Sequence, residues 1–153
     1  MKYLISACLA NIPVRYDGKA YHYEKIAQLI QTHQAITICP EVSGGLNTPR
    51  LAAEIIGGTA QDVLNRTAKV IDSQGNDVTA AFIDGAFNAL EIAQKHQVST
   101  VVLKENSPSC GTNFIYDGSF SGTKVVGLGI TACLLKQHGF HVISEDDFLK
   151  SLD

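Results

Sequence analysis

Three short apolar runs in this sequence each end abruptly in a polar loop that carries a cysteine. The runs, with the cysteines that follow them, are Lys2–Ala7 with Cys8, Ala35–Ile38 with Cys39, and Val98–Leu103 with Cys110. Apolar runs of this length, rich in β-branched residues, are typical of buried strands. The chain must therefore fold so that three strands are buried and three cysteine loops follow them.

Helical periodicity separates these predicted strands. Apolar residues recur at spacings of three and four over 21–33 and 77–96, and helices are also predicted at 129–138 and 145–152, on either side of a last strand at 140–143. Strands that alternate with helices indicate an α/β fold with a mainly parallel sheet and right-handed crossovers. The carboxyl ends of parallel strands share one edge, where ligands bind, so the three cysteines are expected to converge.

Long loops follow the predicted strands. The segments 39–50 and 104–124 exceed the usual length of a connection in a compact domain, and loops of that length are commonly functional. Residues 51–76 contain two further short apolar runs, at 53–56 and 68–71, which are interpreted as a β flap.

Length and composition favour one cytoplasmic domain over residues 1–153. The net charge is −3 and the isoelectric point is near 5.9, so the whole chain has no electrostatic attraction for nucleic acid. No run approaches the roughly 20 apolar residues of a membrane span, so no membrane partner is expected. Cytoplasmic thiols stay reduced, and four cysteines therefore indicate metal binding, catalysis or core packing before disulfides.

Three converging thiolates have few uses. Structural zinc takes four ligands, commonly in Cys-x-x-Cys pairs, and the sequence has no such pair. The histidines lie in or beside predicted helix ends and are interpreted as surface residues: His22, His33, His96, His138 and His141. A [4Fe-4S] cluster on Cys8, Cys39 and Cys110 fits better and leaves one iron open, although spacing alone also allows three buried packing residues. Cys133 has apolar neighbours and is interpreted as core.

Glu41 and Glu105 lie near this predicted site and are candidates for general acid or base catalysis, the alternative being solvated loop charges. Lys104, Ser107 and Ser109 flank Cys110 and are candidate catalytic residues or turn formers.

Substrate-binding candidates occupy the other two cysteine loops. Arg15 and Arg50 carry guanidinium groups that can hold a carbonyl or a phosphate, or form surface ion pairs. Gly44 and Gly45 allow close backbone approach, and Asp17 completes this group.

A set of short motifs, taken together, resembles one known family. The motifs are Ser6–Leu9, Pro13–Gly18, Cys39–Leu46, Thr48–Arg50, Ser107–Gly111 and Phe120–Thr123. In this order they resemble the TudS-like thiouracil and thiouridine desulfidases, long catalogued as a domain of unknown function. The resemblance covers nearly the whole chain and is to the short, single-domain type, which lacks an additional C-terminal domain.

The resemblance implies a Rossmann-like three-layer sandwich that holds a [4Fe-4S] cluster on Cys8, Cys39 and Cys110. It implies non-redox removal of sulfur from a thiolated pyrimidine, supplied as a base, nucleoside, nucleotide or thiolated RNA. The products are the oxo-pyrimidine and hydrosulfide. Glu41 would move protons, assisted by Ser107 or Ser109.

Two other functions remain open at this point. A cluster-free sulfurtransferase would carry a persulfide on Cys110, activated by Lys104 or a helix N-terminus, and would not need the other two cysteines. A non-catalytic module would bind nucleotides or anions through Gly44, Gly45 and Arg50, and would leave the three cysteines unexplained.

Overall fold

The computed structural model describes residues 2–152, and its centre is a four-stranded parallel sheet in the order β2-β1-β5-β8. The strands are β1 Tyr3–Ser6, β2 Ala35–Ile38, β5 Thr100–Leu103 and β8 His141–Ser144. The predicted parallel α/β sheet is confirmed, with Tyr3 of β1 opposite Ala35 on one side and Thr100 on the other. The chain leaves β1 first toward β2 and later returns to β5, so the sheet has its switch point between β1 and β5.

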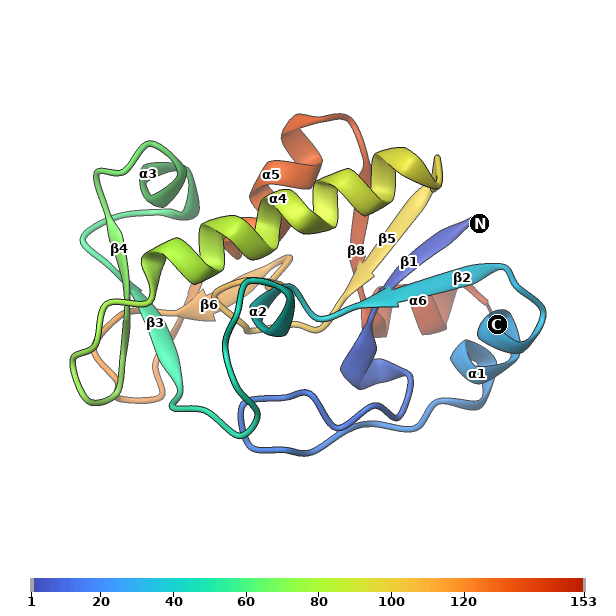
Figure 1. Cartoon of the computed structure of the whole chain (residues 1–153), viewed down its shortest axis with the longest axis horizontal. Coiled ribbons are helices and arrows are strands. Elements are labelled where there is room, and N and C mark those ends of the chain that lie inside the picture. Colours follow the sequence, from blue (N-terminus) through green and yellow to red (C-terminus); the bar gives the residue numbers. More distant parts are fainter. Residues whose placement is uncertain (1, 153) are drawn as a thin grey trace.

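Helices cover both faces of this sheet and make a three-layer sandwich (Figure 1). They are α4 Thr79–Lys95 and α5 Ile130–Gln137 on one face, and α1 Glu24–Gln31 and α6 Glu145–Ser151 on the other. Phe82, Ala86 and Leu90 of α4 are buried, as the periodicity predicts. Ser144 caps α6 by accepting a hydrogen bond from the Asp147 N–H, which confirms the predicted start of that helix. No helix within residues 2–152 has the length and apolar character needed to cross a membrane.

Helix α1 begins at Glu24, later than the periodicity predicts, because residues before it pair with the first cysteine loop. Ala10 and His22 form an antiparallel bridge, and the Tyr21 N–H donates to the Cys8 carbonyl oxygen at 2.7 Å. This pairing holds Tyr21 extended beside the turn η1 Ala7–Leu9, which contains Cys8. The shortened helix therefore leaves an aromatic residue next to the cysteine.

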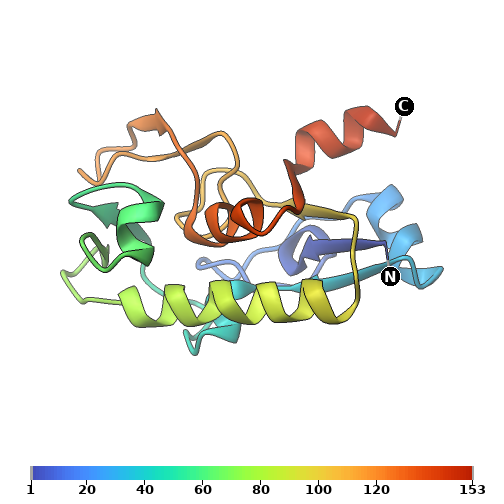
Figure 2. The same ribbon diagram turned by 90° about the horizontal axis from the view of Figure 1, so that it is seen from above.

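Two small antiparallel sheets stand at the end of the molecule away from both termini (Figure 2). One pairs β3 Ala53–Ile56 with β4 Lys69–Asp72, which confirms two strands in the segment 51–76. The sequence prediction missed helix α3 Ala60–Leu64 between them, which starts at a capping box formed by Thr59 and Asp62. It also missed the second sheet, which pairs β6 Phe114–Tyr116, inside the segment expected to be a loop, with β7 Lys124–Val126, which starts at the last residue of that segment.

The second cysteine loop opens with a short helix, α2 Pro40–Ser43, that lies directly against α4. Two glycines make this contact possible. A Cβ on Gly44 would collide with the carbonyl oxygen of Ala81, and a Cβ on Gly85 would collide with that of Pro40. Because α2 starts immediately after Cys39, this packing fixes where Cys39 and Glu41 stand.

We expect Gly85→Ala to destabilise the protein although alanine is the better helix former. The helix preference for alanine is worth up to about 1 kcal/mol, whereas overpacking costs about 1–3 kcal/mol. The added methyl group must push α2 away from α4. Urea unfolding should therefore show a net loss of stability, whereas Asp84→Ala, at an exposed position of the same helix, should show none. A stabilised Gly85→Ala protein would contradict this packing argument.

Candidate active site

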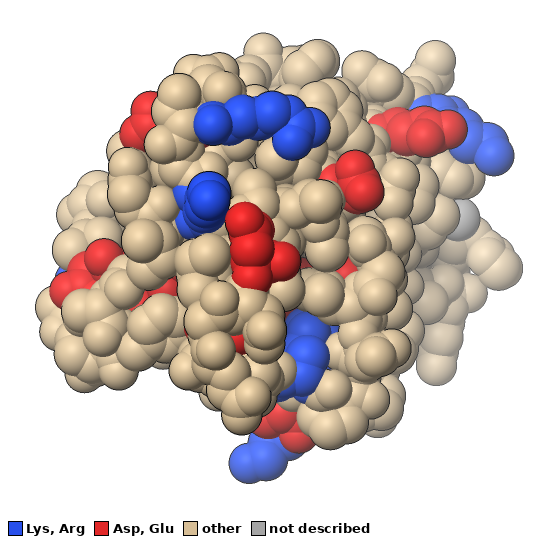
Figure 3. Space-filling view, turned by 60° about the vertical axis from the view of Figure 1, so that its left-hand side comes forward, with Lys and Arg blue, Asp and Glu red and all other residues tan. Residues whose placement is uncertain are grey.

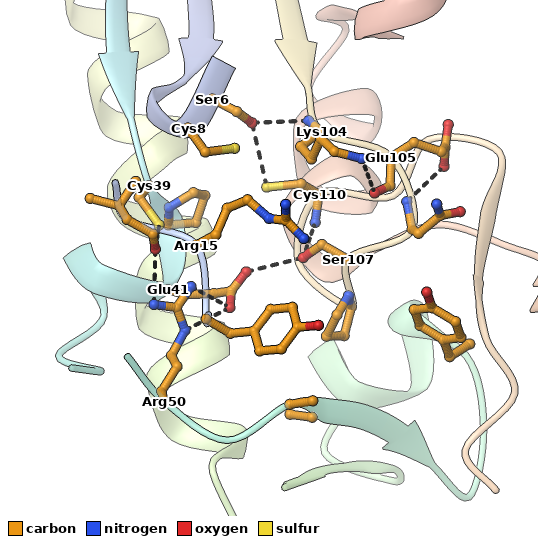
Figure 4. A pocket seen from close by; sticks show the side chains of 18 of the residues that line it. Ser6, Cys8, Arg15, Cys39, Glu41, Arg50, Lys104, Glu105, Ser107 and Cys110 are labelled. Carbon is orange, nitrogen blue, oxygen red and sulfur yellow. Dashed lines mark hydrogen bonds and ion pairs between the residues drawn. The ribbon is translucent and has the colours of Figure 1, made fainter. Parts of the chain in front are cut away.

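A cavity of about 530 Å³ lies at the carboxyl ends of β1, β2 and β5 and is lined by all three strand-end cysteines. Cys8 enters it from η1, Cys39 from the start of α2, and Cys110 from the loop after β5. Figure 4 shows the three side chains on the same side of this cavity. The predicted convergence is therefore confirmed. Cys133 lies elsewhere, on a buried face of α5 in the core, as expected.

The three thiols are shielded from water and influence one another. Burial raises the pKa of Cys8 to about 12, and the neighbouring Cys39 adds to that rise. Burial also raises the pKa of Cys110 well above its ordinary value, with further contributions from Glu41 and Cys39. The Cys39 thiol, whose pKa burial also raises, donates to the carbonyl oxygen of Val14 at 3.7 Å. Nearby Lys104, Arg15 and Arg50 oppose these rises without cancelling them, so the groups are neutral thiols at physiological pH when no metal is bound.

Glu41 is held between an arginine and a serine. Its Oε2 accepts from Arg50 Nε at 3.0 Å and lies 2.9 Å from Nη2, while its Oε1 accepts from the Ser107 hydroxyl at 3.0 Å. The side chains of Arg50 and Glu41 are only 9% and 14% exposed. Ser107 Oγ in turn accepts from the backbone N–H of Cys110 at 3.2 Å. A continuous chain of contacts thus links the carboxylate to the third cysteine.

Lys104 faces the cavity next to a buried carboxylate that the sequence reasoning did not select. Its Nζ lies 3.3 Å from Oε2 of Glu145, and Oε1 of Glu145 accepts from the Glu105 N–H at 3.0 Å. Burial raises the pKa of Glu145, and Lys104 partly opposes that rise. Glu145 directly follows β8, so the rule that placed the cysteines at strand ends also identifies Glu145 when it is applied to the fourth strand.

Glu105 clamps the loop that follows Cys110. Its carboxylate accepts backbone N–H bonds from Asn106, Thr112, Asn113 and Phe114, and side-chain bonds from Thr112 and Asn113. Although Glu105 lines the cavity, its oxygens are engaged by this loop. We therefore propose that Glu105 positions the loop and is not the proton carrier.

The clamp predicts a loss of stability in acid. Burial tends to raise the pKa of Glu105, but backbone hydrogen bonds from Asn113 and Phe114 outweigh it and lower the pKa to about 2. Because the folded pKa is the lower one, the stabilisation is complete above the unfolded pKa near 4.5 and disappears as pH falls toward 2. Thermal unfolding of Glu105→Gln should vary less with pH across that window than the wild type does. If the melting temperatures of the variant and the wild type changed equally with pH, the stabilising role of the Glu105 carboxylate would be contradicted.

Arg15 stands over aromatic rings at the rim of the cavity. Its Nη1 donates to the Tyr21 hydroxyl at 2.7 Å, and its guanidinium lies 4.9 Å from the centre of the same ring. The other terminal nitrogen of Arg15, Nη2, forms an ion pair with Oδ2 of Asp17 at 3.4 Å. Arg15 lines the cavity and Asp17 does not, so Asp17 reaches the site only through Arg15.

Three further candidates from the sequence lie away from the cavity. Ser109 is fully buried and its hydroxyl bonds to that of Thr131 at 2.8 Å, so it ties the loop to α5. Gly44 is pressed against α4, and Gly45 is exposed in a backbone conformation with a φ of 106°. The structure gives these residues packing and turn functions.

Several lining residues were not among the sequence candidates: Ser6, Tyr21, Glu54, Tyr116 and Phe120. Ser6 is the last residue of β1, and its hydroxyl lies 3.8 Å from Cys110 Sγ and accepts from the Lys104 N–H at 3.1 Å. Its position before Cys8 was a usable signal. Phe120, in the loop between β6 and β7, begins one of the family motifs, whereas Glu54 on β3 gave no such signal.

Basic and acidic side chains are interspersed on the face shown in Figure 3, with no large area of one sign. Two basic side chains of the cavity wall are likewise paired, Arg50 with Glu41 and Lys104 with Glu145, which lies outside the lining. The site therefore resembles a small-molecule pocket with paired charges more than a surface for a polyanion.

Comparison with known proteins agrees with this geometry. Residues 3–147 match the model of the 2-thiouracil desulfurase family. The chain belongs to this family. It is 52% identical over 144 residues to the "Uncharacterized protein YbbK" of Bacillus subtilis (strain 168), covering 94% of this chain and 95% of that protein. Membership confirms the resemblance drawn from the sequence motifs.

A solved structure of a 2-thiouracil desulfurase relative matches both fold and sequence. It is described as "[4Fe-4S]-dependent thiouracil desulfidase TudS (DUF523Vcz)" and superposes with a TM-score of 0.86 at 40% identity. The match covers 97% of this chain and 93% of that one. The Rossmann-like α/β fold expected from the resemblance is thereby confirmed.

Proposed function

We propose that this protein removes sulfur from a thiolated pyrimidine without redox chemistry, using a [4Fe-4S] cluster held by Cys8, Cys39 and Cys110. The observation that carries the proposal is the meeting of three cysteines from three strand ends in one cavity beside an oriented carboxylate. Family membership and the similarity to a desulfidase described as [4Fe-4S]-dependent support it. The absence of a membrane-spanning helix in the described part of the chain is compatible with the cytoplasmic location that we also propose.

The donor set fits a cluster better than a single ion. Within residues 2–152, no group of three or more histidine, cysteine, aspartate or glutamate side chains is arranged to hold one metal ion. A cluster binds each thiolate at a different iron, so its cysteines need not meet at one point. Thiols with raised pKa values lose their protons when they bind metal, because the ligand is the thiolate. Three cysteines leave one iron without a protein ligand.

When bound, such a cluster supplies a soft Lewis-acidic iron suited to the substrate's sulfur. The chain's own residues handle water and protons. Arg50 and Ser107 fix both oxygens of Glu41, so the carboxylate is oriented before substrate arrives. Glu41 accepts a proton from the water that attacks the carbon bearing sulfur.

The overall reaction is balanced without an electron donor. Water supplies the oxygen of the new carbonyl group, the carbon–sulfur bond breaks, and sulfur leaves as hydrosulfide with one proton released. Cavity walls built from Pro40, Ile38 and Tyr21 reduce the access of bulk water to this exchange. A thiolated base, nucleoside or nucleotide, or a thiolated nucleotide within RNA, offers the same reacting group.

The test is sulfide release from 2-thiouracil and from 4-thiouridine by protein purified and reconstituted without oxygen. We expect one uracil or uridine per hydrosulfide, and a rate proportional to bound iron. Product formation by iron-free protein at the same rate would contradict the cluster-dependent mechanism. Iron-loaded protein that releases no sulfide from any thiopyrimidine would contradict the proposed activity itself.

The structure gives less support to the alternatives. A persulfide on Cys110 requires a reactive thiolate, yet Cys110 is buried, its pKa is raised, and Lys104 is paired with Glu145. An anion-binding module requires an available guanidinium and glycine backbone, yet Arg50 is held by Glu41 and Gly44 by α4. Neither alternative accounts for three cysteines in one cavity.

A further inference from the structure

Glu54 is a buried carboxylate in the cavity wall that the mechanism above does not use. It lies on β3 and lines the cavity. In Figure 4 this strand runs along the lower side of the pocket, with Cys8 and Cys110 at the upper side. Successive side chains of a strand point to opposite faces. Because Ile55 packs into the core, the neighbouring Glu54 faces away from the core. It is only 7% exposed, and buried carboxylates need partners.

One oxygen of Glu54 holds the loop that follows β6. Oε1 accepts from the Gly118 N–H at 2.9 Å and from the Phe120 N–H at 3.3 Å. Gly118 has a φ of 93°, and a Cβ there would lie 2.6 Å from the carbonyl oxygen of Ile55, so the loop sits directly on β3. Phe120 lines the cavity with a φ of 56°, a conformation that costs energy in a non-glycine residue. Glu54 thus holds in place the loop that brings Phe120 to the cavity.

The second oxygen of Glu54 is available to a ligand. Oε2 receives no hydrogen bond from residues 2–152. Unlike Oε2 of Glu145, which is enclosed beside Lys104, it is not among the enclosed side-chain atoms of that range that lack a hydrogen bond. Oε2 of Glu54 is therefore accessible, and the space that Glu54 lines is the cavity. A carboxylate oxygen accepts hydrogen bonds only, so its complement is a donor on the substrate.

We propose that Glu54 is a substrate-recognition residue that accepts a ring N–H of the pyrimidine while Phe120 packs against the ring. This inference rests on the proposed function, because the ring nitrogens of thiouracil that flank the C=S carbon carry hydrogen. The carboxylate accepts the N–H beside the reacting carbon and so fixes the rotation of the ring in its plane. The ligand class is a cyclic thioamide with an N–H, and fully N-alkylated rings are excluded.

The substitution Glu54→Gln tests the contact while sparing the loop. The glutamine carbonyl oxygen still accepts from Gly118 and Phe120, but its amide group then presents a donor to the cavity where an acceptor stood. A hydrogen bond to a charged group is worth about 10- to 100-fold in affinity. Glu91→Gln, at an exposed position of α4, is the matched control.

The measurement is calorimetric binding of uracil and of 1,3-dimethyluracil to the iron-loaded protein. The wild type and Glu91→Gln should prefer uracil by about 10- to 100-fold, and Glu54→Gln should lose that preference. In turnover of 2-thiouracil, Glu54→Gln should raise KM with little change in kcat and unchanged iron content. Circular dichroism and thermal unfolding confirm that the variant is folded.

The possible results separate the two proposals. A uracil preference that persists in folded Glu54→Gln would show that the methyl groups are rejected by shape, and would overturn the role of Glu54. If the wild type bound uracil and 1,3-dimethyluracil equally well, that result alone would overturn the role of Glu54. If the wild type releases no sulfide from thiopyrimidines but binds uracil through Glu54, the proposed function fails and this inference stands.

Discussion

Replacing Cys39 by alanine is expected to abolish iron binding and sulfide release together. The three cysteines line one cavity and come from three separate strand ends, so no neighbouring thiol can replace the lost one. A cluster that already leaves one iron without a protein ligand would keep only two thiolates. The measurement is iron and acid-labile sulfide per chain after anaerobic reconstitution, where the wild type should hold about four of each.

Cys133→Ala is the matched control, because Cys133 is buried to the same 7% exposure as Cys8 but lies in the core between the helices of one face. It should keep its iron and its activity, at some cost in stability. Cys8→Ala and Cys110→Ala should behave like Cys39→Ala. A fully active Cys39→Ala protein would rule out the three-cysteine cluster and would leave Cys110 as the candidate nucleophile.

The second large effect is expected from Glu41→Gln, which should keep iron but lose turnover by about 10²- to 10⁴-fold. The glutamine oxygen still accepts from Ser107, so the loop that carries Cys110 keeps its support. What is lost is the capacity to take a proton, together with the ion pair to Arg50. The measurement is kcat for 2-thiouracil, normalised to bound iron.

Glu24→Gln provides the comparison, since Glu24 is an exposed glutamate at the start of α1. It should leave both iron content and kcat unchanged. Loss of iron in Glu41→Gln would mean that the carboxylate supports the ligand loops and carries no proton. Undiminished turnover per iron would remove Glu41 from the chemistry, and Glu105 and Glu145 would become the carboxylates to test next.

The sequence was most informative where a local pattern and a global rule agreed. The runs that precede Cys8, Cys39 and Cys110 are apolar, and the parallel sheet they require has one edge at which they all end. That edge could therefore be located before any contact was known. Applied once more, the same rule would have selected Glu145 after β8.

Other parts of the site depend on contacts that no local pattern encodes. Glu105 looked like a catalytic carboxylate in the sequence, but the fold of 112–114 around it decides how its oxygens are used. Gly44 looked like a place for close approach of a ligand, and the close approach is to α4. Glu54 enters the cavity only because the loop after β6 docks on β3. Tertiary packing sets each of these three outcomes.

The order of strands in the sheet has a consequence for how the protein matures. A nascent chain that has been made just past β2 contains Cys8 and Cys39, but Cys110 is more than seventy residues further on and follows the strand on the opposite side of β1. Iron that met this incomplete chain would find no finished site. For the cluster proposed here, insertion would have to wait until β5 and the loop that carries Cys110 have joined the sheet.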